Sequence, residues 1–148
     1  MGGEELIPSN GSASQQSAEV IQRVYEGYTR GDTTTMLAAF HPELEWTYLD
    51  PSLTEPVPQV CRGRGELGAA LERQAHQGLM SELEEIVANG ERVMVVMRTP
   101  GIGALRTWRA DDRTFTVFTV REGRIVSLRD CRGRDEALAA IGRDPRPT

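Results

Sequence analysis

Two charged side chains, Asp130 and Arg98, each follow an apolar row on one face of an expected strand. Because side chains alternate along a strand, Asp130 shares its face with Val126 and Leu128, and Arg98 shares its face with Met94. A mostly apolar pocket needs few polar groups, and a buried carboxylate can serve as its acid or base. We therefore interpret Asp130 as the candidate acid/base. Arg98 would orient it or hold a substrate oxygen. The alternative is an ordinary ion pair, or an aspartate that faces water.

Further side chains could line the same pocket and bind the substrate. Aromatic rings supply apolar contact area, and plain core packing is the alternative for them. The candidates are Trp46, Tyr48, Tyr28, Trp108, Phe118 and the carboxylate of Asp50.

The charged composition restricts the available chemistry. All 17 basic residues are arginine, against 22 acidic residues, for a net charge of −5. The absence of lysine excludes a lysine Schiff base and a P-loop lysine. The acidic balance argues against nucleic acid or an anionic membrane as the partner. With only two histidines and two cysteines we expect no metal and no cofactor, so catalysis would depend on carboxylates supported by arginine.

The chain carries no pattern typical of secretion or membrane insertion. Residues 1–17 lack a basic start and an apolar core, and no apolar run approaches a membrane span. We expect a cytoplasmic protein whose two cysteines are reduced and structural.

Helices are expected first and strands afterwards, which is typical of an α+β fold. Ser17 is the expected N-cap of a helix that stops at Gly31, and Asp32 is the expected N-cap of a second helix ended by His41-Pro42. A third helix follows Gly63. The expected strands are 44–49, 83–88, 92–98, 105–109, 114–121 and 125–131, and the last helix is 135–141.

The same pattern gives one domain. Residues 1–16 are polar and predict a flexible arm, residues 17–142 predict a single domain, and residues 143–148 predict a loose tail. Asn89-Gly90, between two alternating runs, is the strongest hairpin signal.

A set of short stretches in a fixed order resembles the SnoaL-like branch of the NTF2-like superfamily. The stretches are Gly31-Asp32, the run from Phe40 to Trp46, Gly63-Arg64-Gly65, and the run from Arg121 to Val126 followed by Arg129-Asp130. The resemblance implies a cone. In it a curved, mostly antiparallel sheet wraps around N-terminal helices and encloses an internal pocket, in a protein that is often a homodimer. Fold alone does not imply function.

Three enzyme types within that superfamily can be compared residue by residue. The limonene-epoxide-hydrolase type matches Asp130 and Arg98, but its second aspartate falls on Pro100. The polyketide-cyclase type also matches Asp130, and its histidine falls near Thr116, which cannot act as a base.

The ketosteroid-isomerase type matches least. Asp50-Pro51 resembles its base, but the two residues of its oxyanion hole fall near Val24 and Phe115. Two hypotheses stay open. The first is a cofactor-independent isomerase, cyclase or hydrolase that acts on a small apolar oxygenated molecule. The second is a non-catalytic ligand-binding or dimerisation module.

Overall fold

The computed structural model describes residues 9–49, 58–106 and 111–142. Its helices there are α1 (Ser9–Thr29), α2 (Thr33–Ala38), α3 (Gly63–His76), α4 (Ile102–Leu105) and α5 (Arg134–Ala140). Its strands there are β1 (Phe40–Leu49), β2 (Pro58–Arg62), β3 (Glu82–Asn89), β4 (Arg92–Arg98), β5 (Arg113–Arg121) and β6 (Arg124–Cys131). The expected tail, 143–148, lies outside the described residues.

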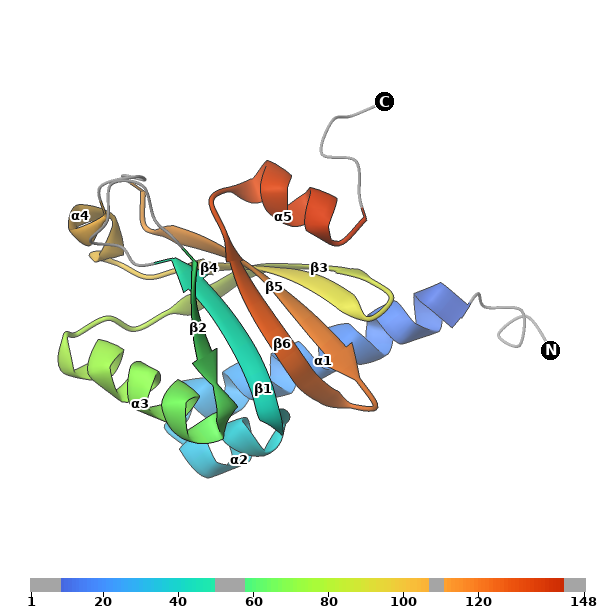
Figure 1. Cartoon of the computed structure of the whole chain (residues 1–148), viewed down its shortest axis with the longest axis horizontal. Coiled ribbons are helices and arrows are strands. Elements are labelled where there is room, and N and C mark those ends of the chain that lie inside the picture. The colour runs from blue at the N-terminus through green and yellow to red at the C-terminus, as the bar shows by residue number, and fades with distance from the viewer. Residues whose placement is uncertain (1–8, 50–57, 107–110, 143–148) are drawn as a thin grey trace.

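The strands form one curved sheet in the order β2-β1-β6-β5-β4-β3, with β2 and β3 at its edges, so the sheet is not closed (Figure 1). Neighbouring strands are antiparallel except for β1 and β6, which run parallel. The expected α+β class and the mostly antiparallel sheet are confirmed.

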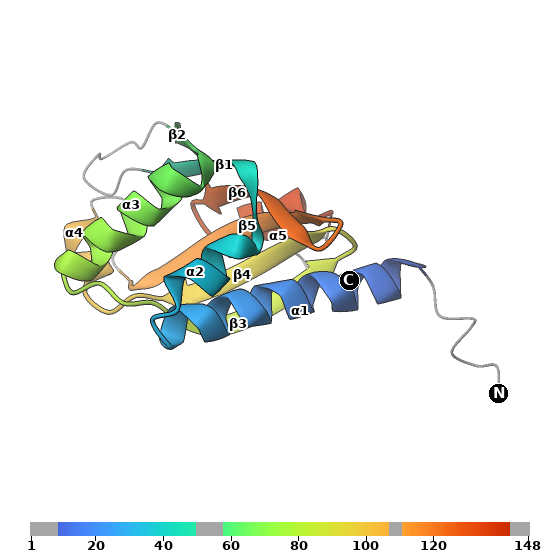
Figure 2. The same ribbon diagram turned by 90° about the horizontal axis from the view of Figure 1, so that it is seen from below.

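The helices cover the two faces of the sheet unequally. Helices α1, α2 and α3 lie on one face, and α5 lies on the other (Figure 2). Val93 and Val95 of β4 belong to the apolar cluster that includes α1, whereas Met94 and Val96 belong to the cluster that includes α5. Both faces of β4 are therefore buried.

Helix α1 begins at Ser9, so the expected start at Ser17 is wrong. Residues 9–16, which were expected to belong to a flexible arm, are part of this helix. The Ser17 hydroxyl donates to the carbonyl of Gly90 at 2.8 Å, and the Gly90 amide donates to the Ser14 hydroxyl at 2.7 Å. These bonds join the helix to the β3–β4 turn. The expected hairpin is confirmed, with Gly90 at a φ of 66° that favours glycine.

The sheet contains an edge strand that the sequence pattern did not indicate. The prolines up to Pro58 indicated a loop, but β2 begins at Pro58, and the first residue of an edge strand tolerates proline. Strand β1 begins at Phe40, before Pro42, and its pairing with β6 is irregular between Phe40 and Glu45. That irregularity accommodates Pro42.

The start of α2 agrees with the sequence pattern, whereas the segment after β4 does not. Asp32 is the N-cap of α2, because its carboxylate accepts from the Thr35 amide at 3.1 Å, as expected. The expected strand at 105–109 is wrong where it is described, since Leu105 ends helix α4. The helix starts after Gly101, whose φ of 96° is left-handed.

Candidate functional site

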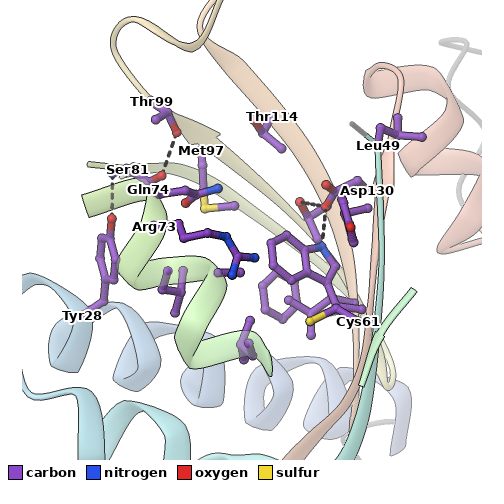
Figure 3. Close-up of a pocket in the computed structure, with 18 of the residues that line it drawn as sticks. Tyr28, Leu49, Cys61, Arg73, Gln74, Ser81, Met97, Thr99, Thr114 and Asp130 are labelled. Atoms are coloured by element: carbon purple, nitrogen blue, oxygen red, sulfur yellow. Dashed lines mark hydrogen bonds between the residues drawn. The ribbon is translucent and has the colours of Figure 1, made fainter. Parts of the chain in front are cut away.

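A cavity of about 450 Å³ is lined by side chains from α1, α2, α3 and the strands of the sheet. Most of the side chains that line it are apolar. In Figure 3, Arg73 and Gln74 extend into it from α3, and Asp130 lies across from them at the end of β6. A cavity of this size accommodates a small organic molecule.

Asp130 is fixed by two side chains from the strands on either side of β6. The indole Nε1 of Trp46 in β1 donates to Asp130 Oδ1 at 3.0 Å, and the Thr116 hydroxyl in β5 donates to the same oxygen at 3.1 Å. The backbone of Leu49 also hydrogen-bonds to the carboxylate. Because β6 lies between β1 and β5, the sheet itself brings the three side chains together.

The surroundings of Asp130 favour its protonated form. Burial raises the pKa of Asp130 to about 6, although the hydrogen bonds from Trp46, Thr116 and Leu49 and the charge of Arg106 act to lower it. Desolvation therefore outweighs the stabilising donors. A carboxyl group with this pKa can accept and return protons near neutral pH.

Arg98, the expected partner of Asp130, lies on the opposite face of the sheet. Its exposed side chain forms a 4.0 Å ion pair with Glu82, and it is not among the residues that line the cavity. Met97, the preceding residue, lines the cavity instead. The expectation fails because both faces of β4 are apolar, so alternation could not show which one faces the cavity.

Arg106 is the guanidinium whose charge acts on Asp130. It is only 9% exposed, it lines the cavity, and it donates to the Arg113 carbonyl at 2.5 Å and to the Thr114 hydroxyl. Sequence reasoning missed Arg106 because it follows a short helix, α4, where a strand was expected. No periodic pattern in this segment indicated which way the Arg106 side chain points.

Four of the expected substrate-binding residues line the cavity. They are Trp46, Tyr48, Tyr28 and Phe118. The rings of Trp46 and Tyr48 lie 5.5 Å apart. Trp108 and Asp50 lie outside the described residues.

Tyr25 is a cavity residue that sequence reasoning missed. Its hydroxyl donates to the sulfur of Met97, and burial raises the pKa of Tyr25, so the phenol stays neutral. Its ring packs edge-on against Tyr28 at 6.0 Å. The helical spacing had placed both tyrosines on the inner face of α1, which was the available signal.

The part of the chain that the structure describes offers neither a metal-ligand cluster nor a membrane-spanning helix. No group of three or more His, Cys, Asp or Glu residues there is placed to hold a metal ion. No helix there is long and apolar enough to cross a bilayer.

The amino-acid sequence also matches a known protein family. A family model for the SnoaL-like domain matches residues 21–128, which is more than half of the chain. The chain belongs to the SnoaL-like domain family. The resemblance inferred from the sequence is thereby confirmed. The match to this SnoaL-like domain ends two residues before Asp130.

Solved structures share the fold of this SnoaL-like domain. Bal32a, from a soil-derived mobile gene cassette, is 21% identical with a TM-score of 0.63, over 80% of this chain and 90% of that one. An NTF2-like protein of unknown function from Burkholderia pseudomallei is 22% identical with a TM-score of 0.61, over 85% and 97%. A protein named as a candidate polyketide cyclase from Xanthomonas campestris is 22% identical with a TM-score of 0.58, over 87% and 98%. No curated protein sequence matches this SnoaL-like domain.

Proposed function

We propose that this SnoaL-like domain is an enzyme that moves a proton on a small, apolar, oxygenated molecule, with Asp130 as the acid/base. One observation carries the proposal. Asp130 is a half-buried carboxylate whose pKa desolvation raises to about 6, and it lines a cavity whose other side chains are mostly apolar. A titratable group in a cavity whose pKa is strongly shifted is a candidate functional group.

The chemistry follows from what one carboxylate can do. Asp130 removes a proton from a carbon next to a carbonyl group, and the electron pair of that C–H bond moves onto the carbonyl oxygen as an enolate. Return of the proton to a different carbon gives an isomer. Attack of the enolate carbon on a second carbonyl group closes a ring, and the proton then goes to the new alkoxide. Neither route requires a cofactor.

Trp46 and Thr116 position the base for this step. Both donate to Oδ1, so they hold the carboxylate in one orientation while they moderate its basicity. The hydroxyl of Thr116 cannot itself accept and return a proton at neutral pH. It is therefore a positioning residue.

The comparisons support the class of ligand. One similar structure is named as a candidate polyketide cyclase, and another, TerC, was crystallised with polyporic acid. TerC is 18% identical to this chain with a TM-score of 0.59, over 85% of this chain and 97% of that one. Those names support a small organic molecule as the occupant.

A second candidate function is a non-catalytic ligand-binding or dimerisation module with the same cavity. One observation favours it. Thr116 lies beside Asp130, near the position where the polyketide-cyclase type carries a histidine, and its hydroxyl does not supply the second titratable group of that type.

Proton exchange on a simple ketone separates the two candidates. Beta-tetralone carries acidic protons next to its carbonyl, and its exchange in deuterium oxide near pH 7 is followed by proton NMR. We expect the wild-type protein to accelerate this exchange and Asp130→Asn to abolish the acceleration. Asp135→Asn, the same change at an exposed position on α5, serves as the matched control. If Asp130→Asn exchanges as fast as the control, the enzyme proposal fails.

The assembly and location of the protein are separate proposals. We propose a homodimer in the cytoplasm, as the sequence indicated. Light scattering of the purified chain tests the first, and fractionation of the cells that make it tests the second. A monomeric mass at the concentrations of the assay would reject the dimer.

A further inference from the structure

Arg73 lines the cavity and is an exposed residue. It extends from α3 into the cavity (Figure 3), and no ion pair or hydrogen bond satisfies its guanidinium among residues 9–49, 58–106 and 111–142. Arg113, which lies outside the cavity, is by contrast paired with Glu84 at 2.8 Å. The five N–H donors of Arg73 are therefore available to a bound molecule.

Hydroxyl groups at the same side of the cavity also have hydrogens to donate. Ser81 Oγ and Thr99 Oγ1 lie 2.7 Å apart, so one hydroxyl hydrogen joins them and the other is left to donate elsewhere. Tyr28 Oη accepts from the Ser81 amide at 3.0 Å, and its own hydrogen has only the distant sulfur of Met80, at 3.8 Å. All three hydroxyls line the cavity.

Gln74 adds a further amide donor beside them. Its side chain extends from α3 into the cavity next to Arg73, and it forms no hydrogen bond within the described residues. These donors lie on the α3 side, and Asp130 lies across the cavity. Glu66, the carboxylate that α3 also contributes to the lining, accepts from the Arg62 amide at 2.8 Å. The two sides of the cavity complement different ends of one molecule.

This arrangement of donors favours a carboxylate as the bound group. A guanidinium and nearby neutral donors bind a carboxylate well, because its two oxygens accept parallel hydrogen bonds from the arginine fork. The mostly apolar lining of the rest of the cavity suits the apolar body of such an acid.

We infer that the molecule bound in the cavity is an apolar carboxylic acid, and that Arg73 is the residue that binds its carboxylate. The inference rests on the proposed function, and it adds the orientation of the substrate. The carboxylate faces α3, and the carbon that loses its proton faces Asp130.

Binding of two probes that differ in one charged group tests this inference. Isothermal titration near pH 7 measures the dissociation constants of naphthoate and of the uncharged naphthamide. We expect the wild-type protein to bind naphthoate at least about tenfold more tightly, since a charge-assisted hydrogen bond contributes that much. Arg73→Gln should lose this preference and keep its affinity for naphthamide. Arg73→Lys should restore part of it by charge alone.

Arg124→Gln is the matched control, because it removes the same charge from an exposed position outside the cavity. It should retain the preference of the wild-type protein. Equal affinities of the wild-type protein for both probes, no binding of either probe, or a preference that survives Arg73→Gln would each overturn the inference. Proton exchange on beta-tetralone, which has no carboxylate, tests the proposed function independently of these binding results.

Discussion

The indole Nε1 of Trp46 donates a 3.0 Å hydrogen bond to Oδ1 of Asp130 and so links the two parallel strands, β1 and β6. Thr116 donates to the same oxygen from the other neighbouring strand. The Asp130 carboxylate, which faces the cavity, thus accepts hydrogen bonds from both strands that flank β6, namely β1 and β5. Its basicity depends on the balance between these donors and burial.

Asp130→Asn is expected to stabilise the protein near pH 7. The folded-state pKa of Asp130, about 6, lies above its ordinary value of 3.8, so burial penalises its ionised form. The stability that this raised pKa provides is fully present below about pH 4 and is lost as the pH rises through about 6. Asparagine keeps an oxygen that can accept from Trp46 and Thr116 without carrying the charge. Near pH 7 the free energy of unfolding should rise by roughly 1–3 kcal/mol.

Urea unfolding of both proteins at several pH values measures this difference. The advantage of Asp130→Asn should shrink as the pH falls from about 6 toward 4, because the carboxyl of the folded wild-type protein becomes protonated over that range. Asp135→Asn, an exposed change on α5, should show no such pH dependence. An advantage of the same size at every pH would mean that the effect does not come from ionisation of Asp130.

Trp46→Phe is expected to raise the pKa of Asp130 above about 6. The change removes the N–H donor that lowers this pKa, and a hydrogen bond to a charged group is worth about one pH unit or more. A carbon NMR titration of the Asp130 carboxyl group measures the pKa directly. Tyr48→Phe alters a neighbouring cavity residue that does not bond to Asp130, and it should leave the value unchanged. A lowered pKa in Trp46→Phe would contradict the proposed role of the indole.

Arg98→Gln is expected to change neither activity nor stability appreciably. Its ion pair with Glu82 is exposed, and such pairs contribute about 0–1 kcal/mol. Arg106→Gln should by contrast lower the free energy of unfolding by roughly 1–3 kcal/mol, because it leaves the Arg113 carbonyl and the Thr114 hydroxyl without their buried donor. Thermal unfolding and the exchange assay compare the two variants. Loss of exchange in Arg98→Gln alone would restore the sequence-based assignment.

The sequence predicted Asp130 because a carboxylate after Leu128 breaks an otherwise apolar strand face. It could not place Arg98, because Val93 to Val96 are all buried. Since both faces of β4 are apolar, the alternation does not indicate which face lines the cavity. The positions of the Arg106 and Arg73 side chains depend on how α4 and α3 pack over the sheet. Those positions are set by tertiary packing, which no local periodicity records.

The pH dependence of kcat/KM for proton exchange on beta-tetralone tests most directly whether Asp130 is the base. In the wild-type protein the rate should rise with pH through about 6 and then level off, because only the ionised carboxylate accepts a proton. Asp130→Asn should show no catalysed exchange at any pH. A wild-type rate that does not change between about pH 4 and 8, or an Asp130→Asn variant that follows the wild-type curve, would contradict the role of Asp130.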